Sequence, residues 1–350
     1  ANALDLERRG ITLLSPVFDL DFGKEAMASA MLGVGKQLGI PKPRCLPALL
    51  SGAKAVRRHT AAVEKQGQEL LASLRPDDKV LVLITRNYGL SDPVLNMGIP
   101  RLLLERGHKV ITLSHLPAHD LDLSEDYPNL YWPFGQHILS GAKLVAHHPN
   151  LYAVYLTNHG CGPDTMLSYL FRKEMGDKPY LQIEVDEHFS PVGVITRIEA
   201  FLQSLEGRPA QPLPAGFSLT SVVHRPTAVA AVPERTGGPL LVPDLPPFTA
   251  YLRAYCEAAW ETETRTLRLD STTLPLGRAE TSSKEYLPFP ALLGGVLTAA
   301  EAESGPFQVL LPSTQGAEAD GQYPWGVETV LERQGLCRVK VIAPELETLP

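Results

Sequence analysis

The stretch KVLVLIT, residues 79–85, decides the fold class because it is a continuous run of β-branched and other apolar residues. A strand covered on both faces has this pattern, whereas a half-exposed strand alternates apolar and polar residues. Three similar runs follow it: KVITLS at 109–114, LYAVYLT at 151–157 and YLQIEVD at 180–186. Helical patterns separate these runs, and strands that alternate with helices predict a parallel sheet with right-handed crossovers.

The segments around these strands carry apolar residues at helical spacing. We expect helices at 24–37, 47–75, 93–107, in the second part of 130–148, at 164–176 and at 192–205. Cys45 opens the second of these helices, between Pro43 and Pro47, and we interpret it as a helix-start residue rather than a ligand.

The proline-rich segment EGRPAQPLPAG, residues 206–216, is typical of a linker between domains. Beyond it the pattern of alternation returns, with strands expected at 238–245, 265–270, 307–312 and 337–344 and helices at 248–263, 289–303 and 326–335. The sequence therefore predicts an α/β protein of two Rossmann-like lobes, each a parallel sheet with helices on both faces, and a cleft between the lobes. The first lobe, with its N-terminal helices, is 1–205, and the smaller second lobe is 217–350.

The composition excludes several classes of function. The chain has 350 residues, 44% of them hydrophobic, which is enough for two domains with real cores. A net charge of −7 without a basic block disfavours nucleic-acid binding. No apolar run approaches the ~18 residues of a membrane span, and the charged start ANALDLERRG is unlike a secretory signal. Because the chain starts at Ala1 and not at Met, we expect a trimmed chain or a fragment.

Cysteines are sparse, and none are paired at CxxC spacing, which excludes a zinc ribbon or a thioredoxin-type redox pair and favours a reducing cytoplasm. The four cysteines are Cys45, Cys161, Cys256 and Cys337.

Ligands of open parallel sheets bind beyond the carboxyl ends of the strands, so the loops there are the candidate sites. The first is TRNYGLSDP at 85–93. Its polar residues are equally consistent with a loop that Ser91 or Asp92 caps, ahead of a helix starting near Pro93. Three of its side chains can hold an anion such as phosphate: Arg86, Asn87 and Tyr88.

The second loop is NHGCGPD at 158–164. Gly160 and Gly162 allow the backbone to turn tightly, and Asp164 is placed to cap the following helix. A thiol just before a helix N-terminus is favoured as a thiolate, which makes Cys161 a candidate ligand or nucleophile. A small residue in a tight turn explains Cys161 equally well.

The third loop clusters Asp186, Glu187 and His188, which resemble an acid–base or metal set but lack the HExxH spacing. Salt bridges with Arg197 and helix capping explain them as well. The remaining loops, 277–295 and 313–326, are glycine-rich turns that enter helices. Neither is a Walker A or a Rossmann fingerprint, so ordinary nucleotide binding is poorly supported.

Together these segments resemble the cluster-carrying proteins of the 2-hydroxyacyl-CoA dehydratase system (2-hydroxyglutaryl-CoA dehydratase D-component-like), and most closely the activase-related ones. The segment NHGCGPDTM…KPYLQIEVDEHFSPVGVITRIEAF is the most specific match. Other matching segments follow the family order: ITLLSPVFDLD, DPVLNMGIPRLL, GRAETSSKEYLPFPALLGG and LLPSTQGAEADGQY. The resemblance implies an ATP-hydrolysing activator that passes an electron to a [4Fe-4S] cluster. Three cysteines hold that cluster, in Gly-Cys-Gly, Glu-Cys-(Tyr/Leu)-Pro and Gly-Pro-Cys-Arg turns.

Only one of the three cysteines is present here. The turn Gly160-Cys161-Gly162 is retained, but Tyr286 stands at the second cysteine position, in KEYLPF, and Glu318 at the third, in GAEADGQY. One thiolate with a phenol and a carboxylate is a poor site for an iron–sulfur cluster, because such clusters prefer soft thiolate ligands.

Three hypotheses follow from the resemblance, and the sequence leaves enzymatic activity open. The first is a cluster-deficient homologue of the electron-accepting component, without cofactor, that binds or scaffolds a partner subunit or ATPase activator. The second is an active [4Fe-4S] reductase or dehydratase component that uses Cys161 with non-cysteine or intersubunit ligands. The third is a binder of a CoA-type ligand or nucleotide in the cleft. The candidate cleft residues are Arg86, Asn87, His159, Asp186 and His188.

Overall fold

The computed structural model describes residues 6, 8–17, 23–158, 160–186, 190–208, 218–219, 224, 229–235, 237–282, 284–314, 316 and 318–345. The chain divides into two compact units, Ala1–Gln66 and Gly67–Pro350. The first unit contains helix α1 (Gly23–Gln37) and most of α2 (Lys42–Ala72), and the second contains both sheets. Most of the expected linker, 209–216, lies outside the described residues, so the lobe boundaries stay a prediction.

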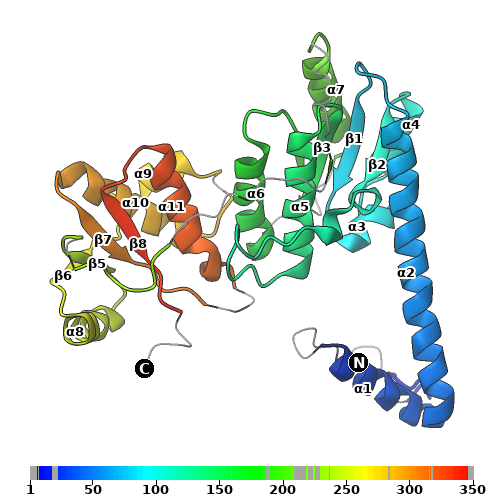
Figure 1. Ribbon diagram of the computed structural model, residues 1–350, viewed down its shortest axis with the longest axis horizontal. Helices are drawn as coiled ribbons and strands as arrows, with labels where there is room; N and C mark the ends of the chain where they lie inside the picture. Colours follow the sequence, from blue (N-terminus) through cyan, green and yellow to red (C-terminus); the bar gives the residue numbers. More distant parts are fainter. Residues whose placement is uncertain are drawn as a thin grey trace. The chain divides into compact units, whose positions relative to one another are not determined.

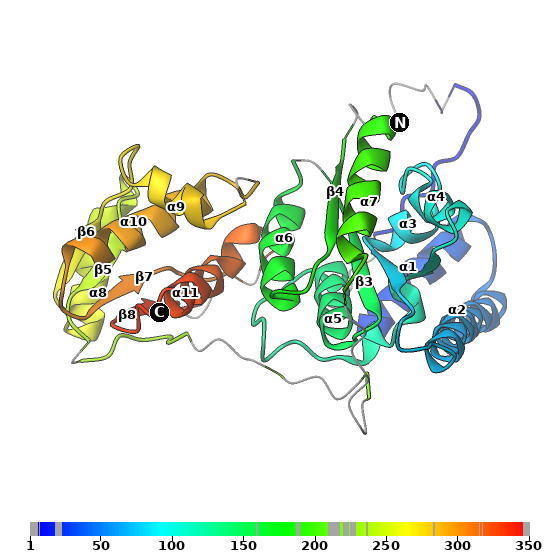
Figure 2. The ribbon, with the colours of Figure 1, turned by 90° about the horizontal axis from the view of Figure 1, so that it is seen from above.

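The first sheet has four parallel strands in the order β2-β1-β3-β4. Every residue of the first strand is buried, as the apolar run at 79–85 predicts. Helices α5 and α6 cover one face of the sheet and α7 the other (Figures 1 and 2). The strands are β1 (Val80–Ile84), β2 (Lys109–Thr112), β3 (Leu151–Asn158) and β4 (Leu181–Val185). The helices are α3 (Asn87–Ser91), α4 (Ile99–Glu105), α5 (Pro133–His147), α6 (Gly162–Met175) and α7 (Pro191–Leu205), with short 3₁₀ turns at Leu113–His115 and Ala118–Asp120.

The second sheet is also parallel, with the order β6-β5-β7-β8. In each sheet the strand that comes second in the chain lies at one edge, next to the first strand. The third and fourth strands lie on the opposite side of the first strand. The topology is repeated although the sequence shows no repeat. The strands are β5 (Leu240–Pro243), β6 (Thr264–Leu267), β7 (Phe307–Leu310) and β8 (Val339–Ile342). The helices are α8 (Phe248–Trp260), α9 (Leu274–Glu280), α10 (Pro288–Ala302) and α11 (Tyr323–Arg333), with a 3₁₀ turn, η4 (Ala319–Gln322).

Helix α6 joins the two sheet layers of the second unit. The ring of Tyr169 packs edge-on against Phe289 of α10, with centroids 5.5 Å apart, and its hydroxyl donates to the carbonyl of Gly326 in α11 at 3.2 Å. The same hydrophobic core cluster contains side chains from both sheets. The two predicted α/β lobes are therefore confirmed, and they share one core along α6.

Three expectations about helices need correction. The helix expected at 93–107 is only α4, because the Asp92 carboxylate accepts the amides of Val94 and Leu95 and holds a turn there. Helix α2 begins at Lys42, so Cys45 lies inside the helix and not at its start. Helix α9 was not expected. In the described part of the chain, no helix combines the length and apolar character needed to cross a bilayer.

Candidate functional site

The order of the first sheet reverses between β1 and β3, and the crevice at such a point is where ligands of open α/β sheets bind. Ile84, the last residue of β1, pairs with Tyr155 of β3. The loops that follow these two neighbouring strands begin with Arg86 and contain Cys161. The structure therefore brings together the first and second candidate loops.

Arg86 is the centre of this site. Its Nη2 donates to Cys161 Sγ at 2.7 Å, and its Nε and Nη2 donate to Asp164 Oδ1 at 3.0 and 2.6 Å. Its guanidinium lies 4.1 Å above the ring centroid of Phe134, and the side chain is 19% exposed. Burial lowers the pKa of Arg86, but the hydrogen bond and charge of Asp164, with smaller contributions from Cys161 and Tyr88, outweigh it and raise that pKa. The arginine is therefore held as a cation against the thiol.

Asp164 holds the Arg86 side chain in place, and both of its carboxylate oxygens accept hydrogen bonds. While Oδ1 binds Arg86, Oδ2 accepts the backbone amide and the Nδ2 of Asn158 at 2.8 and 3.0 Å. The side chain is 3% exposed. The expectation that Asp164 caps α6 was wrong: the N-cap residue is Cys161, which makes no side-chain cap bond, and the Asp164 carboxylate binds Arg86 and Asn158 instead.

The Gly-Cys-Gly turn is confirmed as a tight strand-to-helix turn. Gly160 has a φ of 65°, a conformation that L side chains rarely adopt. A Cβ atom on Gly162 would lie 2.6 Å from Cε2 of Tyr286, so the tyrosine ring rests directly on the backbone beside Cys161. Two positions that the resemblance assigns to one cluster site, 161 and 286, are thus neighbours although they lie on different lobes.

Glu318, the third position, is the N-cap residue of η4, the 3₁₀ turn that leads into α11. Burial is the main cause that raises the pKa of Tyr323 to about 12, and the charges of Asp320, Tyr286 and Glu318 raise it further. The charges at positions 286 and 318 therefore both act on Tyr323, at the start of α11.

The remaining candidate residues are less informative. Asn87 begins α3 and is exposed. Asp186 lies just past β4, separated from β1 by β3. Arg197, expected to pair with the acidic cluster, donates to the carbonyl of Gln182 at 2.8 Å. His159, Glu187 and His188 lie outside the described residues.

The other cysteines lie on other elements. Cys45 Sγ donates to the carbonyl of Ile40 at 3.6 Å, and Cys337 is exposed. Cys256 is buried in α8, and burial is the main cause that raises the pKa of its thiol to about 11. Over the described ranges, no group of three His, Cys, Asp or Glu side chains is arranged to hold a metal ion.

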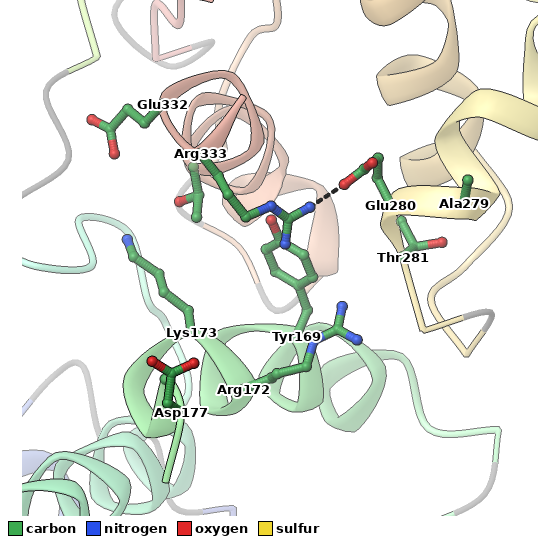
Figure 3. A pocket seen from close by; sticks show the side chains of 11 residues that line it. Tyr169, Arg172, Lys173, Asp177, Ala279, Glu280, Thr281, Glu332 and Arg333 are labelled. Atoms are coloured by element: carbon green, nitrogen blue, oxygen red, sulfur yellow. Dashed lines mark hydrogen bonds and ion pairs between the residues drawn. The ribbon is translucent and has the colours of Figure 1, made fainter. Parts of the chain in front are cut away.

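A pocket of about 810 Å³ opens at the other end of α6 (Figure 3). Arg172 and Lys173 of α6 line this pocket, and across it Arg333 of α11 pairs with Glu280 of α9. These basic residues lie in the last turns of their helices, where cations favourably complement the helix dipole. Their charge therefore has a structural explanation, and we place the candidate chemistry at Cys161, at the opposite end of this 14-residue helix.

Sequence reasoning missed the supporting side chains of the site. It assigned Asp164 to a cap and did not name Asn158 or Phe134, which position the carboxylate and the guanidinium. The available signal was the rule that the ends of neighbouring parallel strands meet at one edge, but using it requires knowing that β1 and β3 are neighbours.

The first third of the chain matches a family model. Residues 1–116 match the CoA enzyme activase uncharacterised domain (DUF2229). The matched segment includes α1, α2, β1 and Arg86, and it supports the activase-related part of the resemblance. Cys161, Tyr286 and Glu318 lie beyond it. Searches of curated proteins and of solved structures found no significant match to the chain.

Proposed function

We propose that the chain is a cluster-deficient relative of the electron-accepting component of ATP-driven 2-hydroxyacyl-CoA dehydratase systems. It acts as a binding or scaffolding partner of an activator or of an active subunit. The match of residues 1–116 to a CoA enzyme activase domain supports the system. The loss of the cluster is an inference from the donor set around Cys161.

That donor set does not fit a [4Fe-4S] cluster. Of the three positions, only Cys161 offers a thiolate, whereas Tyr286 and Glu318 offer oxygen donors that such clusters disfavour. The observation that carries the proposal is the Arg86 guanidinium, which lies 2.7 Å from the sulfur and is locked there by Asp164. A cation fixed against the thiol occupies one of the directions from which iron would approach and repels it.

The resident residues support a structural role for the site. The Tyr286 ring covers the turn at Gly162, and Lys284 forms an ion pair with Glu184 of β4. Together these contacts join the turn before α10 to the first sheet. What remains of the site thus holds the two lobes together, as a scaffold requires.

Restoring the missing thiolates tests the proposal. We compare the parent chain, Cys161→Ala, and a triple variant that combines Tyr286→Cys and Glu318→Cys with Arg86→Ala, after anaerobic incubation with iron and sulfide, and measure the broad visible absorption of a cluster. We expect equal, background absorption for the parent and Cys161→Ala, and a clear gain for the triple variant, because it supplies three soft ligands and removes the cation from Cys161.

The second hypothesis, an active [4Fe-4S] component, predicts another pattern. The observation that favours it is the cysteine itself, because Cys161 is present at the first family position, as the N-cap residue of α6. In that case the parent chain takes up a cluster and Cys161→Ala loses it. This outcome would refute the hypothesis that the chain binds no cluster.

A further inference from the structure

The unit Ala1–Gln66 has many exposed apolar side chains, and its described residues form no hydrophobic core in which they could be buried. Within its described residues only Gly35 is buried, and neither core cluster of the described chain includes a residue from 1–66. Yet of the 22 large hydrophobic side chains that are exposed among the residues the structure describes, ten belong to this short unit. They are Ile11, Leu13, Val17, Met27, Met31, Leu38, Ile40, Leu46, Leu50 and Val56. Such a concentration marks an interaction surface, because scattered single residues are the norm elsewhere.

The same helices are basic, in an acidic chain. Residues 23–66 contain eight Lys or Arg and two Asp or Glu, whereas residues 67–350 contain 22 Lys or Arg and 33 Asp or Glu. One face of α2 carries two exposed apolar residues followed by two basic residues, at i, i+4, i+8 and i+11 spacing. We call these residues the α2 stripe: Leu46, Leu50, Lys54 and Arg57.

A second exposed apolar patch lies at the start of α8, in the unit Gly67–Pro350. Leu245, Phe248 and Tyr251 are 47%, 63% and 74% exposed, and we call them the α8 patch. Phe248 and Tyr251 are one turn apart on the helix, and the amide of Phe248 donates to the carbonyl of Leu245 at 2.7 Å. The segment 244–263 around them contains four Asp or Glu and one Lys or Arg.

We propose that the α2 stripe of one copy of the chain binds the α8 patch of a second copy, and that twofold symmetry closes a dimer through two such contacts. The leucines of the stripe cover the aromatic rings of the patch, while Lys54 and Arg57 face its acidic surroundings. A second copy fits because it supplies an apolar surface for the leucines of the stripe and acidic residues for its two basic ones. Twofold pairing also buries two such contacts in one dimer, which brings the total buried area closer to that of a stable interface.

This inference does not depend on the proposed function, since it uses no residue of the Cys161 site. The test uses the full chain, with mass measured by light scattering after size exclusion and by sedimentation over a range of concentrations. We expect a dimer for the parent chain. Leu50→Glu and Phe248→Glu should each weaken dimerisation at least tenfold, because each buries a carboxylate in an apolar contact.

Mixing the two variants gives the sharpest result. A heterodimer of Leu50→Glu and Phe248→Glu retains one intact contact, between the stripe of the second variant and the patch of the first. Equimolar mixing should therefore restore dimers that neither variant forms alone.

The matched control is Val94→Asp, at a side chain that is 80% exposed and belongs to neither surface, and it should dimerise like the parent. Circular dichroism checks that each variant is folded. A parent chain that is monomeric at every concentration, or a folded Leu50→Glu variant that dimerises like the parent, would overturn the proposal.

Discussion

Asp164→Ala should lower the free energy of unfolding by about 3 kcal/mol, because removing one partner of a buried ion pair leaves the other charge uncompensated. Asp164 is 3% exposed and binds Arg86 through Oδ1, while its Oδ2 accepts two hydrogen bonds from Asn158. Its loss would leave the Arg86 guanidinium, which lies against Phe134, without this carboxylate partner. The Asn158 amide would lose this acceptor as well. Urea denaturation followed by circular dichroism measures the change.

The exposed ion pair of Arg101 and Glu105 provides the control. Its side chains are 85% and 57% exposed, so Glu105→Ala should leave the free energy of unfolding close to that of the parent, because solvent screens exposed ion pairs. Equal losses of the free energy of unfolding in the two variants would contradict the prediction, because the buried Asp164 pair would then contribute no more than an exposed one.

The second large effect is a dependence of stability on pH that Glu328 causes. This side chain of α11 is 8% exposed, and its Oε2 has no hydrogen-bond partner in the described part of the chain. Burial is the main cause that raises its pKa from 4.5 to about 7. Between these values the folded chain keeps a proton that the unfolded chain releases. The free energy of unfolding therefore falls by about 3 kcal/mol as the pH rises through this window, and the loss persists above it.

Glu328→Gln should remove this loss, because the amide has the shape of the acid without its charge. We expect the variant to be more stable than the parent at pH 8 and close to it at pH 5, measured by urea denaturation at both values. Glu301→Gln, at an exposed position of α10, should follow the parent. A constant difference between Glu328→Gln and the parent at both pH values would contradict the prediction.

The variant must be compared with the parent at each pH, because other groups act in the opposite direction. Burial is the main cause that lowers the pKa of His137 and of His148 to about 4. These histidines make the folded chain more stable as the pH rises from about 4 to about 6.5. The difference between variant and parent cancels their contribution.

The strands were predictable from local sequence because buried parallel strands are continuous apolar runs. The run at 79–85 becomes β1, which is buried at every position. The helices were harder where turn chemistry competes with periodicity: the Asp92 carboxylate holds the turn at 93–98 within a segment that has helical spacing. Helix α9 was missed because its short sequence, LPLGRAE, contains both a proline and a glycine.

The site was predictable only in part. Loop patterns after the strands named Arg86 and Cys161, whereas the family resemblance alone named Tyr286 and Glu318. Their arrangement depends on strand order and on the packing of α6 against the second lobe, which local patterns do not contain. The contact between Tyr286 and Gly162 joins residues 124 positions apart.

The content of iron and acid-labile sulfide in the anaerobically purified chain tests the central claim most directly. We predict far less than one cluster per chain, because the thiol of Cys161 is held by Arg86 and the other two ligand positions carry oxygen. Iron and sulfide at about four of each per chain, lost in Cys161→Ala, would contradict the claim and establish an active [4Fe-4S] component.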